Sequence, residues 1–430
     1  MGLLSIMLVL FFVLIFLKVP IAFALALAAV FPMMHLNLGL TRLINSMYSS
    51  INSFPLLAVP LFLLLGSLMN EGGITRRLVT FSDSLLGHVR GGLGHVNVLV
   101  SMLFAGLSGS ATADTAGVGA MLIPAMKESD FDTEFSVAIT SISSTLGVII
   151  PPSVFMVIYG SIGRVSIGAL FMAGVVPGIL IGFSQMSYVY YVARKNNYPV
   201  RKRTPLKQLG KDAQKAIPAM ILPFIILGGV TTGTFTATEA AAISVVYGLI
   251  LMFVVYRSYK ITDLPRVLAD AVVSYSLPLF SVACAGVMGW LIAYLGAPEA
   301  ISSFISNITT SYLGIYLMLI GFLLIVGTFL SPVTSIIIFM PIIRELGQLA
   351  DIHPVHLGVV VVMTLAIGMV TPPYGMCLLI AAQIGEINPL RAFKAVFPLI
   401  IISLAIVILA VIFPNILLFL PRLMMPNHVL

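Results

Sequence analysis

Charged residues are scarce in this chain of 430 residues, in which Asp, Glu, Lys and Arg together make up 9%. Soluble globular proteins carry about 25%. Hydrophobic residues make up 60%, and the mean hydropathy is +1.12. Apolar runs of about 20 residues, each able to cross a bilayer about 30 Å thick, recur along the chain. The sequence therefore predicts an all-α polytopic membrane protein, since the short alternating strands of a membrane barrel are lacking.

Cysteine is almost absent as well. Cys284 and Cys377 are the two cysteines, and both fall in apolar segments, where a cysteine packs like a small apolar residue. No run of Cys, His or acidic residues has metal-site spacing, and no phosphate loop or Ser-His-Asp order occurs. We therefore expect neither an enzyme nor an organic cofactor.

Basic residues are unevenly distributed. The densest cluster, Ala193–Lys215, lies between two apolar runs, which is typical of a loop on the inner side of a membrane. With the N-terminus placed outside, only Arg42, Arg164, Arg344 and Arg422 fall outside, and the other 18 of the 22 Lys and Arg fall inside. The net charge of +7 thus indicates a lipid bilayer and no nucleic acid as partner.

Ten stretches are predicted to span the membrane. They lie at about 3–17, 20–36, 54–70, 132–160, 167–192, 214–231, 237–256, 271–295, 354–385 and 395–420. Only Lys18-Val19-Pro20 interrupts the apolar start, so one long bent helix is an alternative to two spans there.

Two regions, 91–127 and 311–344, hold apolar arms around a small, polar tip. The tips are Gly106–Thr115 and Gly327–Ser335, and the descending arms are expected to be about ten residues long, too short to cross. We therefore predict two re-entrant hairpins, since irregular backbone at membrane depth needs protein or water around it. The mixed stretches 75–90 and 298–310 before them are interpreted as interfacial helices, with ordinary loops as the alternative.

The same pattern occurs twice, in the same order. In each half a span with Pro-Leu-Phe is followed by a mixed stretch, a hairpin with a Gly-x-x-x-Ser tip and a span broken at Gly-x-x-x-Pro-Pro. Five spans plus a hairpin orient the two halves oppositely, which makes an inverted-topology repeat. Such repeats are typical of secondary transporters, in which solute and ions bind near the midplane on discontinuous helices.

The two breaks, GVIIPPS and GMVTPPYG, leave backbone carbonyls that could bind a ligand. Proline lacks the N–H that would bond the carbonyl four residues earlier. The first proline pair thus frees the carbonyls of Gly147 and Val148, and the second pair frees those of Gly368 and Met369. A bound cation is one natural partner for such carbonyls, and a kink whose carbonyls are satisfied by Ser or Thr is the alternative.

Hydroxyl groups at the tips could complete a cation site, which predicts two sites for two breaks. Asp114 is the one carboxylate expected at membrane depth. It could neutralise a cation, carry a proton, or cap the second arm of the hairpin. The helix N-termini at the tips also suit an anionic solute.

The motifs GLSGSATADTAGVGAMLIPAM, GVIIPPS, GMVTPPYG and KVPIAFALALA resemble those of the large membrane subunit of the tripartite ATP-independent periplasmic (TRAP) transporters. The resemblance covers essentially the whole chain. It implies sodium-coupled import of an organic acid anion, such as sialic acid or a C4-dicarboxylate, through a multi-pass protein of the bacterial inner membrane with its N-terminus periplasmic. It also implies an elevator mechanism, in which a transport domain slides against a scaffold.

Two protein partners follow from the resemblance. One is a periplasmic substrate-binding protein that delivers the solute. The other is a small TRAP membrane subunit, expected as a separate chain because the sequence starts directly with the large subunit's first span. The scaffold would comprise residues 1–90, 166–310 and 387–430, and the transport domain would comprise 91–165 and 311–386.

The breaks and the resemblance together give the candidate site residues. The first sodium site would use Ser108, Ser110, Gly147, Val148, Ile150 and Pro151. The second would use Gly327, Ser331, Gly368, Met369, Thr371 and Tyr374. The solute would bind near Thr112, Asp114, Ser153, Thr334, Ser335 and Thr371.

Other functions remain as alternatives at this point. A proton-coupled anion transporter or antiporter of similar inverted-repeat architecture is the main one. A channel is a further alternative, which uptake against a gradient would exclude. An intramembrane enzyme using Asp114 would need a second catalytic group at the same depth, and the sequence offers none.

Overall fold

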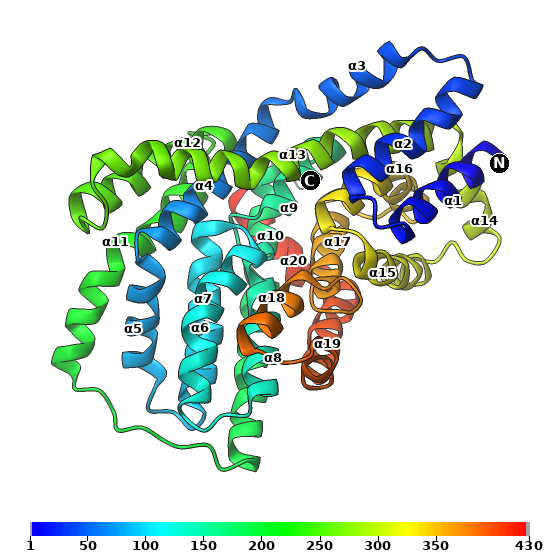
Figure 1. Ribbon diagram of the computed structural model, residues 1–430. Helices are drawn as coiled ribbons and strands as arrows, with labels where there is room; N and C mark the ends of the chain where they lie inside the picture. The colour runs from blue at the N-terminus through cyan, green and yellow to red at the C-terminus, as the bar shows by residue number, and fades with distance from the viewer. Residues whose placement is uncertain (1, 427–430) are drawn as a thin grey trace.

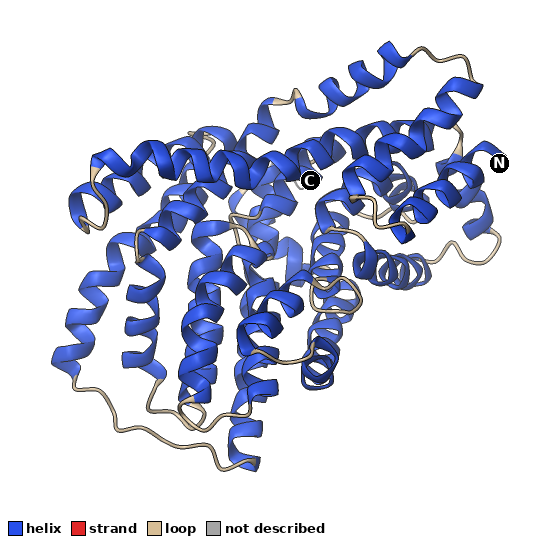
Figure 2. Cartoon of the chain, viewed as in Figure 1, coloured by secondary structure: helices blue, strands red, loops and turns tan. Residues whose placement is uncertain are grey.

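The computed structural model describes residues 2–426, apart from the side chain of Ser274. Within these residues the chain is helical throughout, with turns and loops between the helices (Figure 2). The first half contains α1 (Gly2–Phe16), α2 (Ile21–His35), α3 (Leu40–Ile51), η1 (Phe54–Leu57), α4 (Ala58–Glu71), α5 (Ile74–Leu86), α6 (Gly92–Ser108), α7 (Ala111–Lys127), α8 (Thr133–Ser144), η2 (Thr145–Val148), α9 (Val154–Gly163) and α10 (Ile167–Lys195).

The second half continues with a similar number of helices. They are α11 (Leu206–Thr231), α12 (Ala237–Ile250), η3 (Leu251–Val255), η4 (Ile261–Asp263), α13 (Leu264–Tyr294), α14 (Ala297–Ser306), α15 (Tyr312–Phe329), α16 (Pro332–Leu349), α17 (Pro354–Gly368), α18 (Met376–Gly385), α19 (Pro389–Ile412) and α20 (Asn415–Met424). The all-α prediction is confirmed for the described residues.

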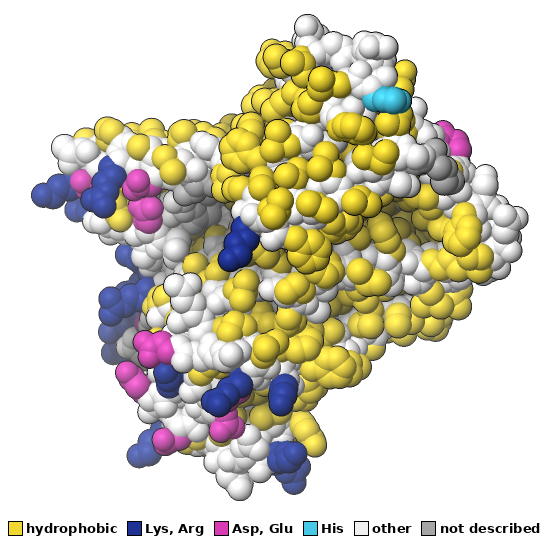
Figure 3. Space-filling model, turned by 45° about the vertical axis from the view of Figure 1, so that its right-hand side comes forward, with side chains coloured by type: hydrophobic (Ala, Val, Ile, Leu, Met, Phe, Trp, Pro, Cys, Tyr) yellow, Lys and Arg dark blue, Asp and Glu magenta, His cyan; other side chains and the backbone are white. Residues whose placement is uncertain are grey.

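Eight helical segments of the described chain are long and apolar enough to cross a membrane. Large apolar side chains also remain exposed on the surface, among them Phe16, Phe183 and Phe224 at 82%, 60% and 74%. Figure 3 shows such side chains over most of one face, with Lys and Arg gathered towards its left and lower edges. This distribution is the one expected of a multi-pass membrane protein.

Several boundaries differ from those predicted. α11 begins at Leu206 rather than near 214, because the polar residues before the apolar run continue the same helix. The predicted last span, 395–420, is two helices, since α19 ends at Ile412 and α20 follows Pro414. At the start of the chain the break at Lys18, whose φ is +63°, separates α1 from α2, and the two helices pack against each other.

The expected arm length of about ten residues is wrong. α6 and α7 have 17 residues each, and α15 and α16 have 18 each. The reason lies at the tips, where the small and polar residues stay helical. In the first tip only Gly109 and Ser110 lie outside the helices, and α7 begins at Ala111.

The mixed stretches 75–90 and 298–310 form helices, as predicted, in preference to loops. They are α5 and α14, each started by a glycine with positive φ, Gly73 and Gly296. The sequence did not predict α3, an amphipathic helix without buried residues that lies along α13.

The two halves interlock through their broken helices. α18, from the second half, packs against α7 and α8 of the first, and α9, from the first half, packs against α16 of the second. In Figure 1, α5, α6, α7 and α8 run side by side below the long helix α13, which crosses the top of the molecule. α13 in turn contacts α2, α3, α4 and α16.

Candidate ion and solute site at the hairpin tips

The first tip is a two-residue turn between α6 and α7. Gly109 takes a left-handed conformation with φ +63°, which favours glycine, and Ser110 is extended. The Ser110 hydroxyl caps α7 by accepting from the Ala113 amide at 3.4 Å and lies 3.2 Å from the Thr112 hydroxyl. Ser108, fully buried, accepts from the Ser110 amide at 3.4 Å. Three of the predicted hydroxyl residues therefore surround one turn.

The first break separates α8 and η2 from α9. The Pro151–Pro152 bond is cis. Ser153 follows this bond, and its side chain bonds to the chain before and after the break. Its hydroxyl donates to the Val148 carbonyl at 2.5 Å and, as the cap of α9, accepts from the Met156 amide at 3.3 Å. Val148 is thus satisfied by a serine, as the kink alternative requires.

The first tip and the first break are in direct backbone contact. A Cβ added to Gly147 would lie 3.3 Å from backbone atoms of Ser110 and Ala111. The Val154 amide donates to the Gly109 carbonyl at 3.4 Å across the same contact. No residue between 2 and 426 donates a hydrogen bond to the Gly147 carbonyl. One carbonyl freed by the proline pair therefore keeps its acceptor capacity next to the tip.

The second tip repeats the arrangement of hydroxyl groups. Ser331 caps α16 by accepting from the Thr334 amide at 3.2 Å, and its hydroxyl lies 2.8 Å from that of Thr334. The Ser335 hydroxyl donates to the Ser331 carbonyl at 3.0 Å. Thr334 and Ser335 are buried and Ser331 is half-buried.

The second break, too, lies against its tip. A Cβ added to Gly368 would lie 2.8 to 2.9 Å from three backbone atoms of Gly327, and the Tyr374 amide donates to the Thr328 carbonyl at 3.0 Å. Here the freed carbonyls have amide donors, Thr371 for Gly368 at 3.1 Å and Cys377 for Met369 at 3.0 Å. A carbonyl has two lone pairs. The Gly368 carbonyl therefore retains one acceptor position, whereas the Met369 carbonyl also accepts from the Leu378 amide at 3.5 Å.

The two breaks differ in exposure. Pro151, Val148 and Ser153 are buried and Ile150 is half-buried. In the second break Tyr374 is 45% exposed, and Thr371 is half-buried with its hydroxyl donating to the Ile367 carbonyl at 3.0 Å. The predicted residues thus gather as one buried and one more open group.

Asp114 lies one helical turn after Ser110 and is fully buried. It does not cap the hairpin arm, since Ser110 has that position. Neither carboxylate oxygen has a hydrogen-bond partner among the described residues. Ser101 of α6 and Ser144 of α8 lie beside the carboxylate, so Asp114 faces the helices beneath the tip.

A buried polar network under the first tip was missed from the sequence. The Asn97 amide donates to Thr140 at 2.6 Å, Ser143 donates to the Asn97 oxygen at 3.1 Å, and Ser143 and Ser101 are 3.1 Å apart. The hydroxyl-rich run Ile139–Thr145, ITSISST, just before the first break was a signal that could have revealed it.

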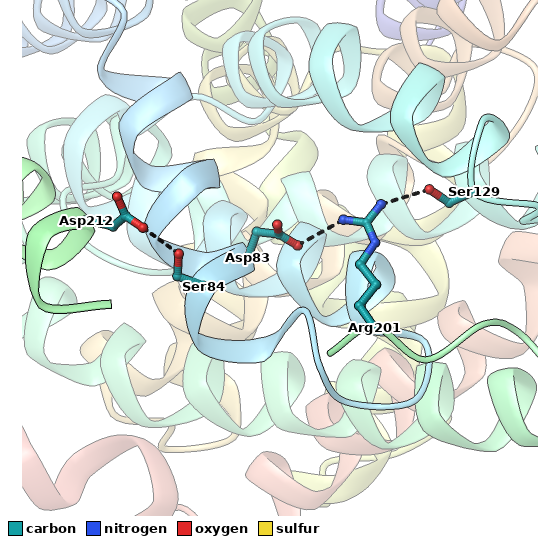
Figure 4. Close-up of polar contacts among 5 residues, drawn as sticks. All are labelled: Asp83, Ser84, Ser129, Arg201 and Asp212. Atoms are coloured by element: carbon teal, nitrogen blue, oxygen red, sulfur yellow. Dashed lines mark hydrogen bonds and ion pairs between the residues drawn. The ribbon is translucent and has the colours of Figure 1, made fainter. Parts of the chain in front are cut away.

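The basic loop between α10 and α11 ties neighbouring elements together. Arg201 contacts Asp83 of α5 at 3.4 Å and Ser129 at 2.9 Å, while Ser84 donates to Asp212 of α11 at 2.6 Å (Figure 4). These contacts link α5, α11 and the turn between α7 and α8.

Tyr198 anchors the same loop. Its hydroxyl donates to Asp132 at 2.6 Å, and its ring packs against Phe131 and Phe135. Burial, reinforced by the Asp132 carboxylate, raises the pKa of Tyr198 to about 12.

Comparison with known proteins gives the family. The family model described as the tripartite ATP-independent periplasmic transporter, DctM component, matches residues 8–416. The sialic acid TRAP transporter large permease protein SiaM of Vibrio cholerae is 35% identical over 95% of this chain and 96% of its own length. The C4-dicarboxylate TRAP transporter large permease protein DctM of Pseudomonas aeruginosa is 36% identical over 87% and 88%.

Two solved structures share the fold. They are the YdaH transporter of Alcanivorax borkumensis, with TM-score 0.61 and 12% identity over 87% of this chain and 88% of that one, and MtrF of Neisseria gonorrhoeae, with TM-score 0.58 and 15% identity over 87% and 84%. The relatives are transport permeases, so the prediction that the chain is no enzyme is confirmed. The chain belongs to the DctM family, the large membrane component of the tripartite ATP-independent periplasmic transporters.

Proposed function

We propose that this chain imports an organic acid anion together with Na⁺, and that one Na⁺ binds at each contact between a tip and a break. The observation that carries the proposal is the duplication of that contact. In each half a serine-capped tip lies backbone to backbone against a proline-pair break, through Gly147 in one half and Gly368 in the other.

The chemistry of these groups suits Na⁺. Hydroxyl and carbonyl oxygens are the hard, neutral ligands that such a cation prefers. Ser110, Ser331 and the Gly147 carbonyl provide them where the breaks interrupt helical hydrogen bonding. The carbonyls of Val148 and Gly368 can contribute only their second lone pair, and that of Met369 already accepts from two amides.

The solute would bind between tips and breaks. Thr112 and Thr371 are half-buried there, and the buried hydroxyls of Ser153, Thr334 and Ser335 line the same turns. Asp114 lies deeper, so a role in balancing cation charge fits its position better than direct contact with an anion.

The relatives support the solute class and the partners. Their names specify sialic acid, C4-dicarboxylates and, in Escherichia coli, 2,3-diketo-L-gulonate, all of which are organic acids. We infer that this chain works with a small TRAP subunit and a periplasmic binding protein, in the bacterial inner membrane with its N-terminus periplasmic. In an elevator cycle, the hairpins and broken helices would move together against the remaining helices.

The test is reconstitution of the permease with both partner proteins in proteoliposomes. Uptake of labelled sialic acid and succinate is measured with an inward Na⁺ gradient, then with K⁺ in place of Na⁺, at several pH values. We expect that one of these acids is taken up, and that its uptake requires Na⁺. Uptake that follows a proton gradient without Na⁺ would favour the proton-coupled alternative instead.

A variant tests the site itself. Ser110→Ala combined with Gly147→Leu removes one hydroxyl ligand and places a side chain against the tip, and should abolish Na⁺-driven uptake. Ser187→Ala with Gly228→Leu is the matched control, because Ser187 is exposed and nothing lies within 4 Å of a Cβ at Gly228. Full uptake by the first pair would refute the site assignment.

A further inference from the structure

A cavity of about 450 Å³ lies away from the tips, at the joint between α4 and α5. We call it the joint pocket. Three elements meet there: the α4–α5 joint with α5, the polar N-terminal part of α11, and the loop after η3. The lining residues are Glu71, Gly72, Gly73, Arg76, Arg77, Thr80, Asp212, Lys215 and Ser258.

The floor of the joint pocket is held by the protein's own contacts. The Arg77 guanidinium donates to the carbonyls of Gly72 and Gly73 at 3.1 and 2.9 Å and lies 4.0 Å over the Tyr256 ring. The Ser258 hydroxyl donates to the Gly72 carbonyl at 2.7 Å. The pocket is therefore a built feature whose walls are fixed before any ligand arrives.

Two cations on its rim have no partner of their own. The side chains of Arg76 and Lys215 form no ion pair or hydrogen bond with another residue of the described chain, although their backbone carbonyls accept from the hydroxyls of Thr80 and Tyr256. Asp212 does not bond to either cation, because its two carboxylate oxygens accept from Ser84 at 2.6 Å and Gln208 at 2.9 Å. The three cations of the lining, Arg76, Arg77 and Lys215, also outnumber its two carboxylates, Glu71 and Asp212. A phosphate group, which accepts several charge-assisted hydrogen bonds, matches this pair of cations.

The surroundings point to a phosphate carried by a lipid. Lys215 is the last polar residue of α11 before its apolar run AIPAMILPFIILGGV. Ile217, Ile221 and Phe224 on that run are 49%, 42% and 74% exposed, as expected of side chains that face acyl chains. Tyr256 stands at the end of the neighbouring apolar segment, a position typical of the membrane interface. The pocket thus opens where headgroups and acyl chains meet.

We propose that the joint pocket binds the headgroup of a phospholipid, with its phosphate between Arg76 and Lys215 and its acyl chains along α11. Basic pockets between membrane helices bind lipid headgroups in this way. Glu71, on the same wall, provides an acceptor for a headgroup ammonium, so phosphatidylethanolamine fits better than phosphatidylglycerol. Because α5 leads directly into the hairpin of α6 and α7, a bound lipid would brace the joint that positions the first tip.

Native mass spectrometry of the delipidated full-length chain tests the proposal. The protein is titrated separately with phosphatidylethanolamine, phosphatidylglycerol and inorganic phosphate. We expect one tight site for phosphatidylethanolamine, whose Kd rises about tenfold in an Arg76→Gln, Lys215→Gln variant. Lys207→Gln with Lys211→Gln is the matched control, since both lysines are exposed on α11 outside the pocket and should leave the Kd unchanged.

Further variants test the separate roles of the carboxylate and of the two cations. Glu71→Gln should weaken the binding of phosphatidylethanolamine and leave the binding of phosphatidylglycerol unchanged. The charge-preserving pair Arg76→Lys, Lys215→Arg should retain the site, which separates lost binding from misfolding. Inorganic phosphate binding as tightly as the lipid, or an unchanged Kd in the double Gln variant, would overturn the proposal.

Discussion

Replacing Gly368 with alanine is the sharpest test of how the second tip and break are packed. The added Cβ would lie 2.8 Å from the Gly327 oxygen and 2.9 Å from its carbonyl carbon and Cα. Non-bonded carbon atoms prefer about 3.5–4.0 Å, so one backbone must move by roughly 0.6–1.0 Å. All three atoms belong to the backbone, so none can rotate away as a side chain could. We expect a loss of about 1–3 kcal/mol in the free energy of unfolding.

The same hairpin provides the comparison. Gly327→Ala would place its Cβ 3.3 Å from Gly368 Cα and should cost less, while Gly321→Ala, in the same helix α15, has nothing within 4 Å. Alanine is the better helix former by about 1 kcal/mol, so Gly321→Ala should be neutral or stabilising. Unfolding by SDS in mixed micelles measures all three. A Gly368→Ala protein as stable as Gly321→Ala would refute the backbone contact.

Four further outcomes follow from individual side chains. Ser153→Ala removes a helix cap and the donor to a buried carbonyl and should lower the free energy of unfolding by about 1–3 kcal/mol in the same SDS assay. Tyr316→Phe should have a similar cost, because it leaves the buried His356 ring nitrogen without its hydroxyl partner. Tyr198→Phe should remove a pH dependence of the melting temperature. The raised pKa means that the neutral phenol stabilises the fold below about pH 10 and that this contribution is lost as pH rises through about 12. Asp132→Asn should shift that loss to lower pH.

Controls for these outcomes lie close by. Ser187→Ala removes an exposed hydroxyl of α10 and should stay within about 0.5 kcal/mol of the unaltered protein. Tyr312→Phe removes the hydroxyl of a residue whose ring packs against Tyr316, and it keeps both the ring contact and the hydrogen bond between Tyr316 and His356. An effect of either control as large as that of its partner variant would contradict the assigned hydrogen bonds.

Much of the fold was accessible from hydropathy, because apolar length decides which segments cross a membrane. The interruption at Lys18 and the helices α5 and α14 followed from local pattern. The length of the hairpin arms did not follow from local pattern, because a Gly- and Ser-rich tip looks irregular in sequence. In the folded chain only Gly109 and Ser110 of the first tip lie outside the helices. The extent of a helix near such residues depends on what packs around them.

The candidate site divides in a similar way. The proline pairs could be recognised because their backbone effects are local. The sequence offered Asp114 as one candidate for the cap of the second arm, whereas the structure gives that position to Ser110. The donors that satisfy the freed carbonyls could not, since Cys377 reaches Met369 only through the folding of the chain around the second break. The hydroxyl-rich run Ile139–Thr145 indicates a buried polar network beneath the first tip, but it does not identify Asn97, 43 residues before Thr140, as the partner.

The interlocking of the halves has a consequence for biosynthesis. The Lys127 amine of α7 reaches the Gly385 carbonyl of α18, 258 residues later in the chain. While the ribosome is still producing the second half, α7 and α8 lack the helix that finally covers them, and Asp114 would be shielded less well. Chains truncated before α18 should therefore be recognised by membrane quality control, and completion of the nascent protein should coincide with its protection from proteolysis.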